Sequence, residues 1–419
     1  MNKIQINLYD LLTCISNVQD LITKRLSRHQ KQVGYLSYRL AEELEFPLEK
    51  IRDVFIAGII HDIGALSTRE KLELIESEPT NVNSHAFRGA KLFENFGPLK
   101  SITGILKYHH VPWNDGEGMF YEGEEVPLES QIVHLADKVC LLIDDHRNVI
   151  AQIPHIFEQI EEKSGSEFHP YFVEALQKLK PKEYIWLDLA SPDPSDKIAL
   201  KNPFNMQVLD IDDITDLAVI FSRIIDFRSR FTSRHSAGVA KTAEKLAELS
   251  GFSPYECKMM LIAGYLHDLG KVAISDSILE KPSKLNSDEF SEMRGHTYYT
   301  YQSLKPIKQF ETINTWASFH HEKLNGKGYP FHIMGENLSL GSRIMAVADI
   351  FTAITESRPY REGLCQCEVI EILNNMVEAD GIDGKIVNII IDHYDELNQI
   401  REEAQIIAAK EYAEFMKIR

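Results

Sequence analysis

The chain contains two copies of one histidine-rich pattern, and this internal repeat constrains its fold more than any other feature. FIAGIIHDIGA at residues 55–65 and LIAGYLHDLGK at residues 261–271 agree at Ile, Ala, Gly, His, Asp and Gly, and most other positions exchange one apolar residue for another. PLESQIVHLAD at 127–137 and SLGSRIMAVAD at 339–349 agree at Leu, Ser, Ile, Ala and Asp. A domain duplication explains these paired segments better than chance does.

The spacing of the histidines and aspartates repeats in the same way. The interval between the first two histidines of the pattern is the same in both halves, and so is the interval between the third and the fourth. In each half a His-His pair then precedes an aspartate at nearly the same distance. Single histidines are usually core or surface residues, but two sets in register indicate a shared role. The sets are His29, His61, Asp62, His85, His109, His110 and Asp137 in the first half, and His235, His267, Asp268, His296, His320, His321 and Asp349 in the second.

Composition and charge narrow the class of protein. With 419 residues, of which 44% are hydrophobic and 26% charged, the chain is expected to form two or three folded domains. Five cysteines without metal-ribbon spacing predict a reducing cytoplasm, and we find no secretion signal and no apolar run of about 18 residues that would span a membrane. A net charge of −18 argues against duplex nucleic acid, whereas a small anionic ligand can bind where metal ions supply positive charge.

Helical periodicity dominates the chain, and strand-like alternation is scarce. We therefore predict an all-α protein with two tandem domains at residues 1–190 and 207–419, joined by a proline-rich linker at 191–206. SPYECKMMLIAGYLHDLG at 253–270 starts with a helix-capping pattern and ends with a helix-stopping glycine. The charged tail at 392–419 predicts an amphipathic helix that packs within the chain or forms a homodimer.

The donor set predicts a metal centre. One aspartate can contact two cations, one through each oxygen, while the adjacent histidine gives a nitrogen to one of them. Nitrogen and oxygen donors together suit Fe, Mn, Co or Zn better than Ca or Mg. Five histidines and two aspartates exceed the needs of one tetrahedral zinc and are enough for two six-coordinate metals. Two metals about 3.5–4 Å apart can activate a shared water against phosphorus, which predicts hydrolysis of a phosphate ester.

The order His, His-Asp, His, His-His, Asp, with HHEKLNGKGYP at 320–330 and RPYR at 358–361, resembles the HD-GYP family of the HD phosphohydrolase superfamily. The match extends from about residue 235 to residue 387. The family implies a helical fold, two or three metal ions and a cyclic dinucleotide substrate. For this chain it implies two divalent transition metals, Fe or Mn first, with Ni, Co, Mg or Zn as alternatives.

The resemblance also implies roles for individual residues. One metal would be held by His235, His267 and Asp349, and the other by His296, His320 and His321, with Asp268 as the bridge. Lys271 would donate to a phosphate oxygen in catalysis, although it could instead be a solvated helix-end lysine. Arg358 and Arg361 would hold the substrate phosphates, with surface ion pairing as the alternative.

Two further features complete the predicted site. Gly328, Tyr329 and Pro330 would form a substrate-binding loop beside the metals, because glycine permits close backbone approach and proline stiffens the turn. The role of Glu322 is open: it could support a ligand histidine or face water.

The sequence departs from the family pattern in places. Phe231 stands where family members with three metals have a glutamate, so two metals are expected, and Thr352 replaces the second acid of the D-x-F-D string, which puts one supporting hydrogen bond in doubt. The first half keeps every ligand candidate but has Ala65 in place of Lys271, and it has neither G-Y-P nor R-P-Y-R. We expect a degenerate domain with a second metal site and a regulatory or structural role. An independent second active site is the alternative.

These observations together predict a metal-dependent phosphodiesterase that linearises a cyclic dinucleotide, either cyclic di-GMP or 3'3'-cyclic GMP-AMP, and that can cut the product to mononucleotides. The alternatives are an HD-type nucleotide phosphohydrolase and a cyclic-dinucleotide receptor without catalysis. The expected partner is the small nucleotide, without duplex nucleic acid and without a membrane.

Overall fold

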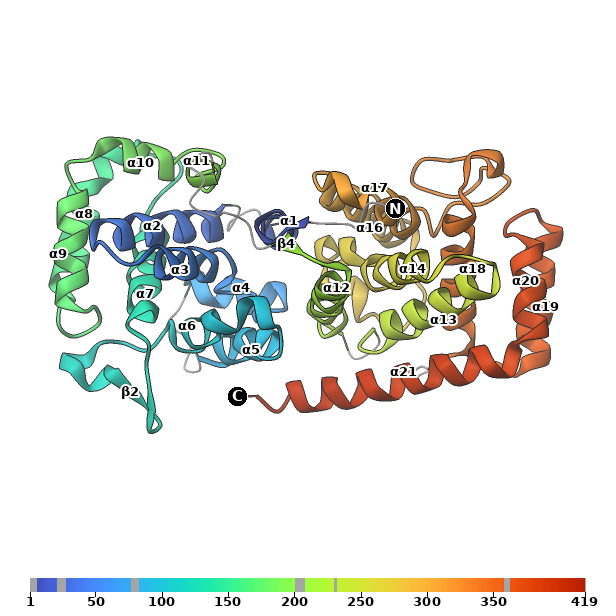
Figure 1. Ribbon diagram of the computed structural model, residues 1–419. Coiled ribbons are helices and arrows are strands. Elements are labelled where there is room, and N and C mark those ends of the chain that lie inside the picture. Colours follow the sequence, from blue (N-terminus) through green and yellow to red (C-terminus); the bar gives the residue numbers. More distant parts are fainter. Residues whose placement is uncertain are drawn as a thin grey trace. The chain divides into compact units, whose positions relative to one another are not determined.

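The computed structural model describes residues 6–20, 28–76, 83–199, 208–229, 232–357 and 362–418. Within them the chain forms two compact, mostly helical units (Figure 1). The C-terminal unit contains residues 6–20 and the described residues of 208–417, and the N-terminal unit contains the described residues between 28 and 199. The predicted all-α class with two tandem domains is confirmed. No helix among the described residues is both long enough and apolar enough to cross a membrane.

The N-terminal unit is built from ten helices, two 3₁₀ segments and one short hairpin among its described residues. They are α2 (His29–Glu43), α3 (Leu48–Ile60), α4 (Thr68–Glu76), α5 (Asn83–Phe93), η2 (Gly97–Ile102), α6 (Thr103–Tyr108), η3 (Asn114–Met119), β2 (Phe120–Tyr121), β3 (Glu124–Glu125), α7 (Leu128–Leu141), α8 (Val149–Glu162), α9 (Pro170–Leu179), α10 (Glu183–Leu189) and α11 (Asp196–Ala199). The buried rings of Phe157 and Trp186 pack edge to face where α8 meets α10.

The C-terminal unit follows the same plan and adds helices at its end. Its elements are β1 (Ile6–Asn7), α1 (Leu8–Asp20), β4 (Val208–Leu209), α12 (Ile211–Asp226), α13 (His235–Leu249), α14 (Pro254–Leu266), η4 (Leu269–Ala273), α15 (Asp276–Leu279), α16 (Ser287–Leu304), η5 (Lys308–Phe310), α17 (Glu311–Ser318), η6 (Gly335–Asn337), α18 (Leu340–Thr355), α19 (Gln366–Glu378), α20 (Gly384–Asp392) and α21 (Tyr394–Phe415). The long helix α21 runs along α13 and corresponds to the predicted amphipathic tail (Figure 1).

The duplication is visible in the order of the helices. Helix α2 begins at His29 as α13 begins at His235, and α3 and α14 each end directly before a His-Asp pair. In each unit these first two helices pack against each other, and α7 and α18 carry the later aspartate. Equivalent helices therefore present equivalent side chains.

Glycine is required after each His-Asp pair. A Cβ at Gly270 would lie 1.9 Å from the carbonyl oxygen of His296, and a Cβ at Gly64 would lie 2.1 Å from that of His85. Any larger residue would push the His-Asp segment away from the helix that carries the next histidine. The glycine that both repeats share thus brings the donors together.

Helix α14 begins as predicted and ends earlier than predicted. The backbone N–H of Ser253 donates to the Glu256 carboxylate at 2.9 Å, and the Ser253 hydroxyl accepts from the N–H of Glu256 at 3.3 Å, which is the expected capping box. The helix stops at Leu266, however, because the backbone N–H of Gly270 donates to the hydroxyl of Thr300 at 2.9 Å and the chain tightens into η4.

The predicted boundary of the first domain, residues 1–190, differs from the structure at its start. Strand β1 pairs antiparallel with β4, with Ile6 opposite Leu209. Helix α1 packs on η4 and α16, where Cys14 Sγ lies 3.1 Å from the carbonyl oxygen of Ser303. Residues 6–20 therefore belong to the C-terminal unit, because their apolar face is buried there and not in the domain that follows them in sequence.

Candidate active site

The ligand candidates of the C-terminal unit lie at helix ends and on inward helix faces, so that five parts of the chain meet. They are His235 at the start of α13, His267 and Asp268 directly after α14, His296 within α16, His320 and His321 after α17, and Asp349 within α18. All are buried except His321, which is partly exposed. The spacing that singled them out thus corresponds to proximity in space.

Their donor atoms form two adjacent groups. The groups are His235, His267 and Asp268, and His296, His320 and His321, with the donor atoms of each group within 4.8 Å of one another. One Asp268 oxygen lies 3.2 Å from Nε2 of His267, and the other lies 3.4 Å from Nε2 of His296. The Asp268 carboxylate therefore stands between the two groups.

Asp349 also faces both groups. Its Oδ1 lies 3.1 Å from Nε2 of His235, and its Oδ2 lies 3.8 Å from Nδ1 of His321. The family resemblance assigns Asp349 to one metal only. In this chain, however, Asp349 lies between the two groups of histidines, as Asp268 does.

Backbone contacts fix the tautomer of three of the histidines. The Nδ1–H of His267, of His296 and of His320 donates to the carbonyl oxygen three residues earlier, at 2.7, 2.6 and 2.6 Å. Each ring therefore turns Nε2, with its lone pair, toward the centre. The Nε2 atom of His267 is buried and has no hydrogen-bond partner among the described residues. A donor set with such an unpartnered lone pair fits a transition metal.

Burial keeps three imidazoles of this centre neutral, those of His296, His320 and His321. It lowers the pKa of His296 to about 3, against the opposing charge of Asp268. It lowers the pKa of His321 to about 4, against the charges of Asp349 and Asp268. The pKa of His320 is lowered well below its ordinary value for the same reason. Neutral imidazoles can bind a metal without first losing a proton.

Lys271 is partly buried and pairs with Asp268. Burial opposes its charge, but Asp268 outweighs this effect and raises the pKa of Lys271 above its ordinary value. The pKa of Asp268 is held well below its usual range, because His267 and Lys271 outweigh the effect of burial. Lys271 is thus a charged, partly buried side chain beside the donor groups.

The predicted G-Y-P loop lies beside the histidines. The backbone N–H of Tyr329 donates to the carbonyl oxygen of His321 at 3.2 Å, and the two ring centroids are 4.9 Å apart. A Cβ at Gly328 would lie 2.4 Å from the Cα of Glu322, so only glycine permits this approach. Pro330 follows Tyr329 at the end of the loop.

Glu322 holds the end of this loop in place. It is 3% exposed, and its carboxylate accepts backbone hydrogen bonds from Phe331 at 2.7 Å, His332 at 3.1 Å and Ile333 at 3.0 Å. Neither expected role describes it, because it does not face water and its hydrogen bonds are to the loop. In the sequence Glu322 directly follows His320 and His321, but its contacts with the loop can be seen only in the folded structure.

Three positions singled out in the sequence lie outside the described residues. They are Phe231, Arg358 and Arg361. Thr352, which replaces an acid of the family pattern, is buried, and its hydroxyl has no hydrogen-bond partner among the described residues. The hydrogen bond that an acid at this position would make in the family pattern is therefore absent among the described residues.

A buried carboxylate that sequence reasoning missed supports His235. Nδ1 of His235 lies 3.2 Å from Oε2 of Glu356, and its Nε2 faces Asp349. Burial opposes protonation of this ring, but the charges of Glu356 and Asp349 outweigh it and raise the pKa of His235 to about 10. Because glutamates are common on helices, the residue type alone gives no signal. The one feature of the sequence that could have indicated this contact is the position of Glu356, two helical turns after Asp349.

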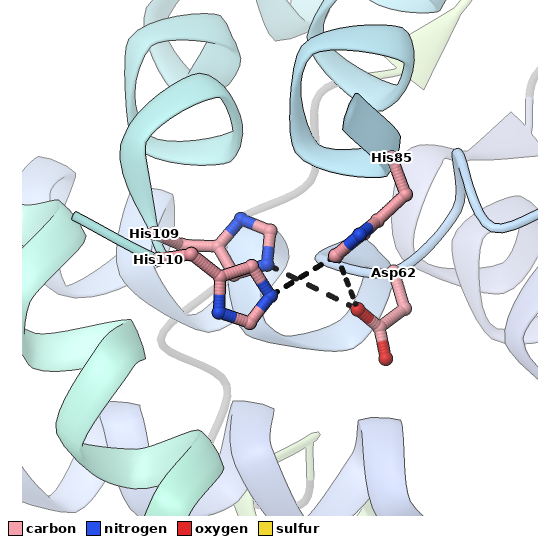
Figure 2. Close-up of side chains that lie close together, drawn as sticks. All are labelled: Asp62, His85, His109 and His110. Carbon is pink, nitrogen blue, oxygen red and sulfur yellow. Dashed lines mark hydrogen bonds and ion pairs between the residues drawn. The ribbon is translucent and has the colours of Figure 1, made fainter. Parts of the chain in front are cut away.

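The N-terminal unit brings its own candidates together in the same arrangement. They are His29 at the start of α2, His61 and Asp62 after α3, His85 in α5, His109 and His110 after α6, and Asp137 in α7. Figure 2 shows His85 and His109 directed toward Asp62, and His110 directed toward His85. One oxygen of Asp62 lies 3.2 Å from Nε2 of His61 and the other lies 3.1 Å from Nε2 of His85. Asp62 therefore occupies the place that Asp268 has in the other unit.

The N-terminal centre differs in its charge. Among the described residues, the ion pairs of Asp62 and Asp137 are with histidines alone. Ala65, which is buried, replaces Lys271. The donor set is consistent with cation binding, but among the described residues neither carboxylate forms an ion pair with a lysine or arginine.

Comparison with known proteins agrees with this duplication. Family models described as HD domain match residues 26–142 and residues 219–386. The chain has the fold of a cyclic GMP-AMP specific phosphodiesterase from Vibrio cholerae whose crystal structure is known, with a TM-score of 0.64, 22% identity, and coverage of 94% of this chain and 98% of the other.

Two relatives extend over most of the chain. The 3'3'-cGAMP-specific phosphodiesterase 1 of Vibrio cholerae is 30% identical over 404 residues, which is 94% of each chain. The 3'3'-cGAMP-specific phosphodiesterase 3 of the same organism is 31% identical over 326 residues, which is 75% of this chain and 69% of the relative. The chain belongs to the tandem HD-domain family of cyclic dinucleotide phosphodiesterases, as its motifs predicted.

Proposed function

We propose that this chain hydrolyses 3'3'-cyclic GMP-AMP and that its active site is the centre of the C-terminal unit. The observation that carries the proposal is the Asp268 carboxylate, which faces two histidine groups and pairs with Lys271. We propose cyclic GMP-AMP instead of cyclic di-GMP as the substrate, because a relative that extends over 94% of the chain carries that specificity in its name. Cyclic di-GMP remains the comparison substrate.

The centre would hold two divalent transition metals, with Fe or Mn first. His235, His267 and Asp349 would hold one ion, and His296, His320 and His321 the other, with Asp268 between them. When bound, two such ions lower the pKa of a shared water and draw charge from a phosphate. The fixed Nδ1–H tautomers support this assignment, because they leave Nε2 lone pairs directed inward.

Other residues of the chain would bind and orient the substrate. The ammonium of Lys271 would donate to a phosphate oxygen and stabilise the charge that develops there. Gly328, Tyr329 and Pro330 would form one wall, with the Tyr329 ring beside His321. Arg358 and Arg361 would hold phosphates through paired hydrogen bonds.

The N-terminal centre would bind metal without turning over the substrate. Its seven donors match those of the other unit, but Ala65 stands in place of the lysine. Burying seven polar groups without a cation would be costly, which supports a metal there. We assign this unit a structural or regulatory role, with a second active site as the alternative that experiment has to exclude.

Turnover tests the proposal. The full chain, loaded with Mn²⁺ or Fe²⁺ under reducing conditions, is incubated with 3'3'-cyclic GMP-AMP and, separately, with cyclic di-GMP, and the nucleotides are separated by chromatography. We expect a linear dinucleotide from 3'3'-cyclic GMP-AMP and slower loss of cyclic di-GMP. Nucleotide recovered uncut from a metal-loaded protein would support a receptor instead. Faster hydrolysis of cyclic di-GMP would overturn the choice of substrate.

A further inference from the structure

His235 is held differently from the neighbouring histidines. His267, His296 and His320 donate from Nδ1 to a backbone carbonyl three residues earlier. His235 is the first residue of α13, and the carbonyl oxygen of Thr232 accepts the backbone N–H of His235 itself at 2.8 Å. Its ring faces a side chain instead, the Glu356 carboxylate at 3.2 Å.

Glu356 is itself held by the C-terminal helix α21. It is 2% exposed, and its Oε2 accepts a hydrogen bond from Nε2 of Gln405 at 3.0 Å. The Gln405 side chain carbonyl accepts from the buried Arg401 guanidinium at 2.5 Å. A Cβ at Gly238 would lie 2.8 Å from Nε2 of Gln405, so the glycine one turn after His235 leaves room for this amide.

Helix α21 is fixed along its length, so Gln405 is held in a defined place. Near its start Glu396 pairs with Lys245 of α13 at 2.9 Å, and near its end Glu411 pairs with Arg223 of α12 at 2.8 Å. Phe415 packs on Phe227, with ring centroids 4.9 Å apart. These contacts bracket Gln405 on both sides.

We propose that Glu356, oriented by Gln405, is a positioning residue that fixes His235 and strengthens its Nε2 as a metal donor. A carboxylate that accepts the other ring N–H of a ligand histidine sets the tautomer, the ring orientation and the basicity of that ligand. The C-terminal helix thereby contributes to the metal centre without touching a metal. This inference depends on the metal centre proposed above.

The N-terminal unit provides an internal comparison. His29 corresponds to His235, and the only hydrogen bond of its ring among the described residues joins Nε2 to Asp137 at 3.0 Å. The position equivalent to Glu356 is Asp144, which is exposed and accepts from the backbone N–H of His146 at 2.9 Å. The two centres should therefore differ in affinity for the ion that this first histidine holds.

Metal titration tests the proposal with a readout other than activity. The metal-free full chain is titrated with Mn²⁺, and free Mn²⁺ is counted by its electron paramagnetic resonance signal. Glu356→Ala, the isosteric Glu356→Gln and Gln405→Leu are compared with Glu403→Gln, a change at an exposed position of the same helix. Each is measured in the wild-type chain and with Asp62→Ala, which removes the N-terminal carboxylate.

We expect one of the two ions to bind about 10- to 100-fold more weakly in Glu356→Ala. The loss should be smaller in Glu356→Gln, which keeps an acceptor oxygen and the side-chain shape, and absent in Glu403→Gln. Glu356→Gln combined with Gln405→Leu should bind Mn²⁺ no more weakly than the more affected single variant, because both act through one chain of contacts.

Wild-type affinity for both ions in Glu356→Gln and in Glu356→Ala would overturn the role of Glu356. Fully additive losses in the double variant would overturn the role of Gln405. A wild-type chain that takes up neither Mn²⁺ nor Fe²⁺ would instead overturn the proposed metal centre itself, so the two failures are distinct.

Discussion

The ammonium of Lys271 pairs with the carboxylate of Asp268, one helical turn earlier in the chain. The equivalent aspartate of the N-terminal unit, Asp62, has the buried Ala65 at that position. The two centres therefore share their donor sets and differ in one positive charge beside the carboxylate between the two histidine groups. This difference is the basis of our proposal that the C-terminal unit is catalytic and the N-terminal unit is not.

Replacing Lys271 with alanine tests that division. We expect Lys271→Ala to lower kcat about 100- to 1,000-fold, as expected for loss of one donor to a developing negative charge. Steady-state kinetics on 3'3'-cyclic GMP-AMP and metal analysis of the same sample check this, and metal content should stay near the wild-type value. Lys241→Ala is a matched control, because Lys241 also pairs with an acid three residues away, Glu244, at 2.9 Å on α13. Equal kcat values for the two variants would argue against a catalytic lysine.

Replacing Asp62 in the N-terminal unit should lower the amount of bound metal without lowering turnover at the C-terminal centre. We expect Asp62→Ala to bind roughly half the metal of the wild-type chain, because one of two binuclear centres is lost. The metal-loaded variant should also unfold at a lower temperature, since bound ions stabilise the folded state by mass action. Metal analysis and calorimetry measure both effects. A partial loss of hydrolysis in Asp62→Ala, with the C-terminal centre still loaded, would favour the alternative of a second active site.

Glu322 should matter for the loop and not for the metals. In Glu322→Ala the three amides of residues 331–333 lose their acceptor, and we expect about 1–3 kcal/mol of lost stability and a higher KM. Urea unfolding and kinetics measure these effects, while metal content should not change. Glu336→Ala, at an exposed position after the same loop, is the control. A normal KM and a normal free energy of unfolding in Glu322→Ala would show that the loop does not need this carboxylate.

Asp226 should make the stability of the metal-free chain depend on pH. It is 5% exposed, and burial raises its pKa to about 7, although His235 and the Ser236 hydroxyl oppose this effect. A carboxyl group with a raised folded-state pKa stabilises the fold below its unfolded value near 3.8, and this contribution is lost as the pH rises through about 7.

The measurement compares the wild-type chain with Asp226→Asn. We expect the free energy of unfolding of the wild type to fall by about 2–3 kcal/mol more than that of the variant between pH 5 and pH 8. Urea denaturation in the presence of a chelator gives both values. Parallel pH profiles for the two proteins would show that Asp226 is ionised throughout.

The two clusters of histidines and aspartates could be predicted from the sequence because helices preserve spacing. The equal intervals between histidines in the two halves place them at the same ends of α2 and α13, of α3 and α14, and within α5 and α16. A repeated pattern of this kind survives in the primary structure even where most other residues differ. The tandem helical domains and the two donor groups of each unit follow from it.

The contacts that depend on distant parts of the chain could not be predicted in this way. The pairing of β1 with β4 joins Ile6 to Leu209, and no local pattern marks so short a strand. The contact of Gln405 with Glu356 connects two separate helical segments, and both are ordinary polar residues. Glu322 stood next to recognised ligands, yet its hydrogen bonds to the loop depend on a backbone turn that the sequence does not specify.

The most direct measurement is the rate at which Asp268→Ala hydrolyses 3'3'-cyclic GMP-AMP under Mn²⁺ or Fe²⁺ saturation. The wild-type chain should produce a linear dinucleotide, and the variant should fall to the rate of a sample without protein, because Asp268 is the carboxylate whose two oxygens face His267 and His296. Hydrolysis by Asp268→Ala at the wild-type rate would contradict the account.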